Sequence, residues 1–300
     1  LYIFNFKLFL LVFFTTICGC MVITLFMVET HLEKKMELNK NIKNYKYLFL
    51  NGKANWVALG DSHPARSLSN AFWLDNLGFA SDNLKSIEQK ALHRINRLKP
   101  EGIILPADPQ LFSFYRLSDD QTKKTKYLIS EKAYFFKFLN PINRPYLITI
   151  VISIYKNKFK NIFNIKKTKN KKPLWIDIPL KERKLETSIR VQLHTPIPQF
   201  QSHSSYKKYQ QMVRYYLQLD IKVCLVRYPV SKLYLNEIQS NKVFNQVDLF
   251  FKTIAKENNL NYVDLSDLLE INKFTDTDHI KSKYKNIINN LVKKGCKIND

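Results

Sequence analysis

Short apolar runs alternate with amphipathic stretches after residue 54, and this alternation limits the possible folds more than any other feature of the chain. Five runs read as buried strands: 56–59, 77–80, 102–105, 223–226 and 262–265. The stretches between them predict helices over 82–98, 206–219, 232–258 and 280–294. Strands that alternate with helices pair in parallel through right-handed crossovers. The pattern therefore predicts an α/β fold, a flavodoxin-like three-layer α/β/α arrangement with a five-stranded parallel sheet.

An uncharged apolar segment precedes this region. Residues 8–28 carry no charge, and a helix of that length spans about 30 Å, the thickness of a bilayer core. A cleaved signal peptide has a shorter apolar core and a small-residue cleavage site. We therefore expect a transmembrane anchor over residues 1–29 and a polar stalk over 30–53. By the positive-inside rule, the lysines that follow the span point the domain inward, because only Lys7 precedes it.

The remainder, residues 54–300, is expected to form one domain with an insertion at about 123–185. Residues 146–155 are apolar but too short to span a bilayer. Residues 156–172 contain eight lysines. Such a segment either packs on the core, which we favour, or rests on anionic lipid as an amphipathic element.

The chain is strongly basic, with 48 Lys+Arg against 25 Asp+Glu and a net charge of +23. A basic excess can attract nucleic acid, anionic lipid or acidic glycans. Here the surplus is mostly lysine and accompanies much asparagine and isoleucine, the composition that AT-rich coding sequences produce. No zinc finger, RNP-like aromatic motif or arginine-rich recognition helix occurs. We expect no nucleic-acid partner.

The four cysteines form no recognisable set. Cys18 and Cys20 lie in the apolar segment, Cys224 in a predicted strand and Cys296 in the tail. No pair has metal-site spacing with a nearby histidine, and no disulfide framework is expected. A phosphate-binding glycine loop is also absent from the sequence. We expect neither a metal nor a cofactor.

Gly60, Asp61 and Ser62 follow the first predicted strand directly. A serine that opens a helix at a strand end meets free N–H groups and the positive end of the helix dipole. These groups can stabilise the oxyanion of a tetrahedral intermediate, and Gly60 allows the sharp turn. A simple helix cap at Ser62 explains the same residues equally well.

A second motif, Asp276-Thr277-Asp278-His279, lies just before the last predicted helix. Its Asp-x-x-His spacing can place both side chains on one side of a turn. Asp276 would then hold Nδ1–H of His279 and leave Nε2 available as a general base. An exposed acidic turn that caps the helix is the alternative. The two motifs together, at opposite ends of an alternating chain, favour the catalytic interpretation.

These two motifs resemble the first and last signature blocks of the GDSL/SGNH hydrolase superfamily. The resemblance implies an SGNH hydrolase-like fold in which Ser62 is the nucleophile and Asp276 and His279 are its partners. It also implies that the Ser62 N–H contributes to the oxyanion hole.

The two middle blocks depart from the family pattern. Residues 76–82 resemble the second block, with either Ser81 or Gly78 at the position whose N–H faces the oxyanion. The third block normally ends in Gly-x-Asn-Asp, and here Asp108 stands where the asparagine donor belongs. An ionised carboxylate cannot donate a hydrogen bond. Asp108 is therefore protonated, or another donor serves, or the site is weakened.

Three other histidines stand near the motifs or near predicted elements. His63 follows the candidate nucleophile and either tunes the pocket or points to solvent. His194 and His203 precede a predicted helix. They line the cleft or lie in a surface loop, and we favour the surface loop.

An N-terminal span followed by a divergent SGNH domain resembles membrane-bound proteins of cell-surface polymer acylation. The resemblance implies an extracytoplasmic serine esterase or O-acyltransferase that acts on O-acyl, mainly O-acetyl, groups of a cell-surface glycan. It also implies a multi-span membrane acyltransferase as a partner. Two alternatives stay open: a non-catalytic glycan-binding or assembly protein on a degenerate SGNH fold, and a basic membrane-surface or nucleic-acid protein.

Overall fold

The computed structural model describes residues 6–38, 48–117, 173–197 and 203–299, together with Thr125 and Ile152. The chain divides into two compact units, Leu1–Tyr45 with Ser130–Asn170 and Lys46–Ile129 with Lys171–Asp300. Apart from Ile152, the segments 146–155 and 156–172, for which we expected an apolar element and a basic loop, lie outside the described residues.

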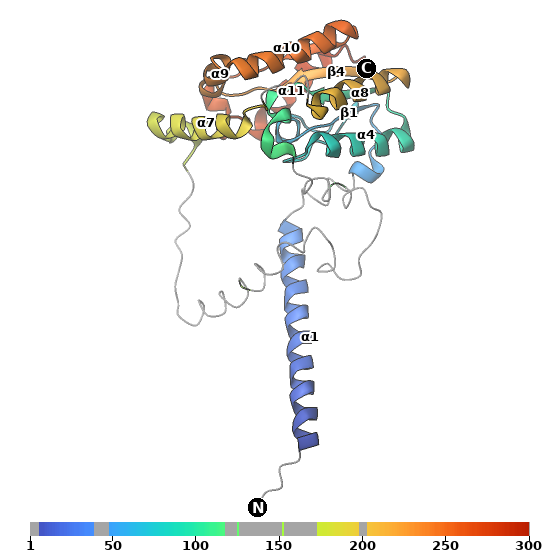
Figure 1. The fold of residues 1–300 in the computed structure, drawn as a ribbon, viewed down its shortest axis with the longest axis vertical. Coiled ribbons are helices and arrows are strands. Elements are labelled where there is room, and N and C mark those ends of the chain that lie inside the picture. Colours follow the sequence, from blue (N-terminus) through green and yellow to red (C-terminus); the bar gives the residue numbers. More distant parts are fainter. Residues whose placement is uncertain are drawn as a thin grey trace, which may run out of the picture. The chain divides into compact units, whose positions relative to one another are not determined.

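In the first unit the main described element is the helix α1 (Phe6–Leu38), which Figure 1 shows as one long helix. Its part Phe9–Thr30 is long and apolar enough to cross a membrane, although a signal sequence passes the same test. Threonine hydroxyls within it donate to carbonyl oxygens four residues back, which satisfies them inside an apolar segment. The helix continues beyond residue 30 into the segment expected to be a stalk.

The second unit contains a parallel sheet of five strands in the order β2-β1-β3-β4-β5. The strands are β1 (Trp56–Ala58), β2 (Leu74–Asn76), β3 (Gly102–Pro106), β4 (Lys222–Arg227) and β5 (Asn261–Asp264). This is the flavodoxin-like order, and it confirms the predicted fold class. The order reverses between β1 and β3, which is where such sheets bind ligands, at the carboxyl ends of the strands.

Helices cover both faces of this sheet (Figure 1). They are α4 (Leu84–Leu98), α8 (Ser204–Gln218) and α10 (Lys242–Glu257) on one face and α3 (Ser62–Ser67) and α11 (Lys285–Gly295) on the other. Two further helices, α7 (Leu180–His194) and α9 (Lys232–Gln239), pack on each other in a third apolar cluster. Short 3-10 turns lie at Pro109–Phe112 (η1), Phe114–Leu117 (η2), Trp175–Asp177 (η4), Ile271–Lys273 (η6) and Ser282–Tyr284 (η7).

Alternate residues of each strand enter two separate cores, as the period of two in a strand requires. Val57, Ile103 and Leu225 pack under α4, α8 and α10, whereas Ile104 and Val226 pack with α11 on the other face. Phe49, within the segment expected to be a stalk, is buried in the first of these cores.

One predicted strand is wrong, and the cause is a buried charge. The second strand is Leu74–Asn76 rather than 77–80. Its middle residue, Asp75, is buried and forms an ion pair with Arg94 of α4. Gly78 has already left the sheet and packs against α3, where an added Cβ would lie 2.8 Å from the Ala65 nitrogen.

Three helix boundaries also differ from the prediction. The helix expected over 232–258 is two helices, because the Asn241 side chain accepts from the Val243 N–H and starts α10 anew. Asn83, not Asp82, caps α4 by accepting from the Ser86 N–H. The last helix begins at Lys285 rather than at residue 280, because Ile280 is buried and bridged to Phe274.

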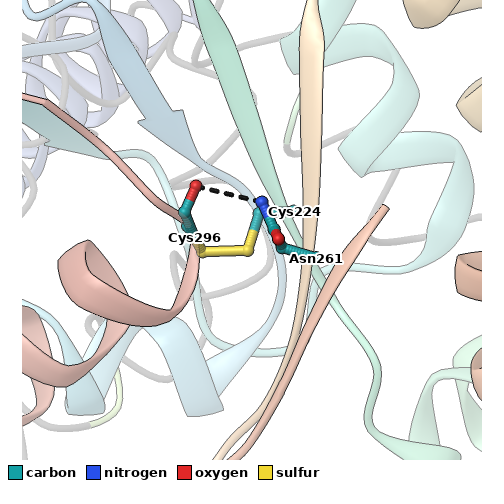
Figure 2. Close-up of a disulfide and its surroundings, with 3 residues drawn as sticks. All are labelled: Cys224, Asn261 and Cys296. Carbon is teal, nitrogen blue, oxygen red and sulfur yellow. Dashed lines mark hydrogen bonds between the residues drawn. A yellow bond between two sulfur atoms is a disulfide. The ribbon is translucent and has the colours of Figure 1, made fainter. Parts of the chain in front are cut away.

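A disulfide joins Cys224 of β4 to Cys296, directly after α11, which corrects the expectation of none (Figure 2). The two residues are 72 positions apart, and their Cα atoms lie at 5.6 Å. Asn261 of β5 donates from Nδ2 to the Cys296 carbonyl oxygen at 3.2 Å. The bond therefore attaches the end of α11 to β4, an interior strand of the sheet. Cys18 and Cys20 are unpaired and exposed on α1.

Candidate active site

The turn that carries Ser62 is built by a glycine and a cap. Gly60 has φ +135°, and an added Cβ would lie 2.7 Å from Pro64 and 3.0 Å from Pro106. No other residue fits there without displacing a proline ring. Asp61 then caps α3 by accepting the His63 N–H at Oδ1 (2.9 Å). Ser62 opens the helix in a half-buried position, and its Oγ has no hydrogen bond among the described residues.

The loop between η6 and η7 holds Asp276 and His279 in contact. Asp276 Oδ1 accepts the N–H groups of Asp278 (3.1 Å) and His279 (2.9 Å), which fixes the carboxylate in the turn. Both of its oxygens lie 2.9 Å from His279 Nδ1. His279 Nε2 is buried and has no hydrogen-bond partner in the described structure. The contact expected from the Asp-x-x-His spacing is present, and it leaves the other ring nitrogen unoccupied.

This loop lies against α3. The ring centroids of His63 and His279 are 5.6 Å apart and nearly perpendicular. Arg66 Nη1 is 3.6 Å from Asp276 Oδ2. Lys285 Nζ donates to the Ala65 and Leu68 carbonyl oxygens, both at 3.0 Å. The segments that carry Ser62 and His279 therefore meet, without a hydrogen bond between the two side chains.

A buried charge cluster joins the same segments from within. His63 Nδ1 is 3.1 Å from Asp108 Oδ2, and His63 Nε2 is 3.4 Å from Asp278 Oδ2. Burial would lower the pKa of His63, but Asp108 and Asp278 together raise it well above its usual value. Gln110 also contacts His63, with Nε2 at 2.9 Å from Nδ1. His63, expected either to tune the pocket or to point to solvent, is 1 % exposed.

Asp108 uses both oxygens inside this cluster. Oδ2 faces His63, and Oδ1 accepts the Tyr228 N–H at 3.0 Å. Burial raises the pKa of Asp108, against the opposing effect of His63. Since the pKa of His63 is raised too, the pair keeps its shared proton to higher pH than a lone histidine would. Asp108 thus acts as the counter-ion of His63 in this structure.

The two candidates for the second oxyanion donor differ. The Gly78 N–H already donates to Asn76 Oδ1 at 3.0 Å. Ser81 has φ +70°, a left-handed conformation that glycine adopts freely, and its N–H has no hydrogen bond among the described residues. Ser81 therefore has both the backbone shape of a glycine position and an available donor.

Arg116 of η2 supports the turn that carries Ser62. It donates from Nη2 to Asp61 Oδ2 at 2.6 Å and from Nη1 to the Asp82 carbonyl oxygen at 3.2 Å. Burial would raise the pKa of Asp61, but the Arg116 charge and the charge and N–H of His63 together outweigh burial, and the pKa is lowered. Asp82 itself pairs with the buried Lys90, yet burial raises its pKa to about 6.

His194 lies at the edge of the cluster, while His203 does not. His194 Nδ1 is 2.8 Å from the Tyr234 hydroxyl and 3.9 Å from Asp278 Oδ2. Burial lowers the pKa of His194 to about 3, so this ring is neutral at pH 7. His203 instead accepts the Ser205 N–H at the start of α8.

The cluster also places possible metal ligands close together. His63, Asp278 and His279 form one group, and Asp61, His63 and Asp108 form another, with ligand atoms within 4.8 Å. Both groups depend on His63, whose two nitrogens face carboxylates. A protonated imidazole cannot bind a metal. The donor set fits an ion-pair cluster better than a metal centre.

A separate pocket of about 530 Å³ lies at the carboxyl ends of β4 and β5. Its lining includes Arg227, Asp248 and Asp264. Arg227 Nη1 donates to Asp248 Oδ1 at 2.7 Å. Neither Ser62 nor His279 lines this pocket.

The sequence motifs contain Ser62, Asp276 and His279 but not much of what surrounds them. The other residues of the site are polar or charged: Asp61, Gln110, Arg116 and Asp278 are buried, and Arg190 is partly exposed. One signal was available, because Asp278 lies inside the Asp-x-x-His motif and Asp61 inside the serine motif. Their partners come from other loops, and no local pattern connects them.

Comparisons with known proteins give a likeness of fold. No family model and no curated protein matches the chain. Among solved structures it is similar to a catalytic mutant of the acetylxylan esterase Axe2 from Geobacillus stearothermophilus, with TM-score 0.39, 9 % identity, and 82 % of this chain and 94 % of that chain covered. It is also similar to a Streptococcus pneumonia protein described as a platelet activating factor, with TM-score 0.36, 11 % identity, and 89 % and 96 % covered. At these TM-scores and identities the two likenesses carry no argument about activity.

Proposed function

We propose that this chain is a membrane-anchored serine esterase or O-acyltransferase of the SGNH type, acting on O-acyl groups of a cell-surface glycan. The observation that carries the proposal is the Asp276–His279 pair. Two carboxylate oxygens hold His279 Nδ1, and the buried Nε2 is left without a partner beside the helix that Ser62 opens. An orienting carboxylate, an imidazole and a serine at a helix start are the parts that acyl transfer requires.

The reaction would proceed in two halves. His279 Nε2 takes the Ser62 proton while Oγ attacks the ester carbonyl, and the N–H groups of Ser62 and Ser81 stabilise the oxyanion. The intermediate collapses, His279 returns the proton to the leaving alkoxide, and an alcohol departs from an acyl-serine. Water or a sugar hydroxyl then attacks this ester, with His279 again as the base, to release an acid or form a new ester.

The disulfide bears on where the domain resides. Disulfides persist in oxidising compartments and are rare in a reducing cytosol. Cys224 and Cys296 are both buried and bonded to each other. With α1 as the anchor, we place the α/β unit on the extracytoplasmic side, against the lysines that follow the span. There it would meet cell-surface glycans, and a multi-span membrane acyltransferase would supply acyl groups from the inner side.

Labelling with a fluorophosphonate probe tests the proposal on the full chain in detergent. We expect wild type to be labelled, Ser62→Ala not to be labelled, and His279→Ala to be labelled far more slowly. Ser240→Ala is the matched control, because Ser240 is exposed at the end of α9 and hydrogen-bonds only to the Glu237 carbonyl oxygen. Equal labelling of wild type and Ser62→Ala would show that Ser62 is not the nucleophile. Absence of labelling in wild type would favour a glycan-binding or assembly protein.

A further inference from the structure

We propose that His63 is a positioning residue: as a buried cation held between Asp108 and Asp278, it offsets the charge of the second carboxylate beside His279. The inference rests on the proposed function, since it assigns His279 the role of the base. It adds a residue with a defined task next to the nucleophile.

The imidazole ring of His63 connects three segments of the site. His63 comes from the start of α3, Asp108 from the end of β3 and Asp278 from the loop before α11. The distances are 3.1 Å from Nδ1 to Asp108 and 3.4 Å from Nε2 to Asp278. All three side chains are nearly inaccessible to solvent. A pair buried in this way is screened little by water or salt, so its charges act at full strength on their neighbours.

His279 faces two carboxylates, and only one of them is the expected partner. Asp276 holds Nδ1 at 2.9 Å, and Asp278 Oδ1 lies 3.4 Å from the same nitrogen. Two ionised carboxylates beside one imidazole would favour its protonated form strongly. A base that is protonated at working pH cannot accept the serine proton. The site therefore needs a cation for Asp278, and the closest one is His63.

Other groups face this cluster but do not replace His63. Arg190 is 3.7 Å from Asp278 and partly exposed, Arg66 pairs with Asp276, and His194 is neutral because burial lowers its pKa to about 3. Other titratable groups whose charge acts on His63, Asp108 or Asp278 include Asp61, Arg227 and four tyrosines, Tyr115, Tyr209, Tyr228 and Tyr234. Arg227 pairs with Asp248. Burial raises the pKa of each of these tyrosines, so they carry no charge at neutral pH.

The same contacts explain how the site accommodates Asp108 in place of asparagine. A bare carboxylate at the position of the usual asparagine would repel a developing oxyanion. Here Asp108 is compensated by His63 and by the Tyr228 N–H. The exchange of asparagine for aspartate and the presence of His63 therefore compensate each other.

The test compares pH profiles of kcat/KM for p-nitrophenyl acetate in full-length wild type, His63→Gln, Asp278→Asn and the double variant. We expect His63→Gln to shift the acid limb of the profile to higher pH by about one unit, because the charge of Asp278 is left without His63 as its partner. Asp278→Asn should move it down, because a carboxylate 3.4 Å from His279 Nδ1 is removed. The double variant should return close to wild type. His203→Gln, which removes a histidine outside the cluster, should leave the limb in place.

Two results would overturn the inference. One is an equal loss of rate at every pH in His63→Gln, which indicates packing alone. The other is an acid limb that stays at the same pH in Asp278→Asn. This measurement also tests the inference if His63→Gln does not fold. Histidine NMR titration of His279 in the same variants reports its protonation without turnover. A wild type that lacks esterase activity but shows these titration shifts would refute the proposed function and retain the role of His63.

Discussion

Arg116 and Asp61 form a buried ion pair in which Nη2 donates to Oδ2 at 2.6 Å, directly before the residue that opens α3. Both side chains are buried, so water cannot take the place of a lost partner. Arg116→Met is therefore expected to destabilise the fold by about 3–5 kcal/mol, the usual effect of leaving one buried charge unpaired. Urea denaturation measures the loss.

Asp61→Asn in the same background should recover part of this stability, because it removes the unpaired charge. Lys232→Met is the control, since the pair between Lys232 and Asp267 is exposed and should contribute less than about 1 kcal/mol. A loss of the same small size in Arg116→Met would contradict the importance of the pair.

Asp276→Asn tests how much the orienting carboxylate contributes. The amide keeps the size of the side chain but stabilises the wrong tautomer of His279, so kcat should fall by roughly 10²- to 10⁴-fold. Ester hydrolysis by the full chain gives the number, and circular dichroism confirms the fold. A fall smaller than about threefold would show that Asp276 serves only as a turn cap.

His194 predicts a loss of stability in acid. The unfolded chain binds a proton on this residue below about pH 6.5, whereas the folded chain does so only near pH 3. Stability therefore decreases as pH falls through this window, by roughly 5 kcal/mol in all.

His194→Asn cannot titrate but can still hydrogen-bond to Tyr234. The difference in unfolding free energy between wild type and this variant should shrink steadily from pH 7 to pH 3. Opposing groups such as Asp82, whose pKa is raised to about 6, cancel in that difference. A pH-independent difference would mean that His194 takes up its proton at the same pH in the folded and the unfolded chain.

Removal of the disulfide is expected to weaken the α/β unit considerably. Cys224→Ala with Cys296→Ala should lower the unfolding free energy by about 4 kcal/mol, because the bond closes a 72-residue loop. Dithiothreitol should lower the stability of wild type and leave the variant unchanged. Cys18→Ala with Cys20→Ala should have no effect on this unit, since both thiols lie on α1. Insensitivity of wild type to reductant would argue against the bond.

The sequence predicted the strands that are buried on both faces and missed the one that carries a charge. Val57, Ile103 and Leu225 sit in uninterrupted apolar runs, and those runs are strands. The run over 74–76 contains Asp75, which excludes it from any apolar pattern. Arg94, one helix later, compensates the aspartate. Only the folded chain shows that pairing.

The candidate site was also predictable only in part. The Asp276–His279 contact spans three residues, so the spacing alone predicted it. The contacts of His63 reach across 45 residues to Asp108 and 215 residues to Asp278. They depend on the order of the strands, which brings the ends of β1 and β3 and the last loop to one edge. A local motif cannot contain that information.

The bond from Cys224 to Cys296 encloses β4, α9, α10, β5, the loop with His279 and α11 in one covalent ring. The ring closes only once residue 296 has been synthesised and has reached an oxidant. Any truncation upstream of that residue removes the closure. The loop that carries His279 therefore becomes part of a closed ring only through a cysteine that follows it in the chain.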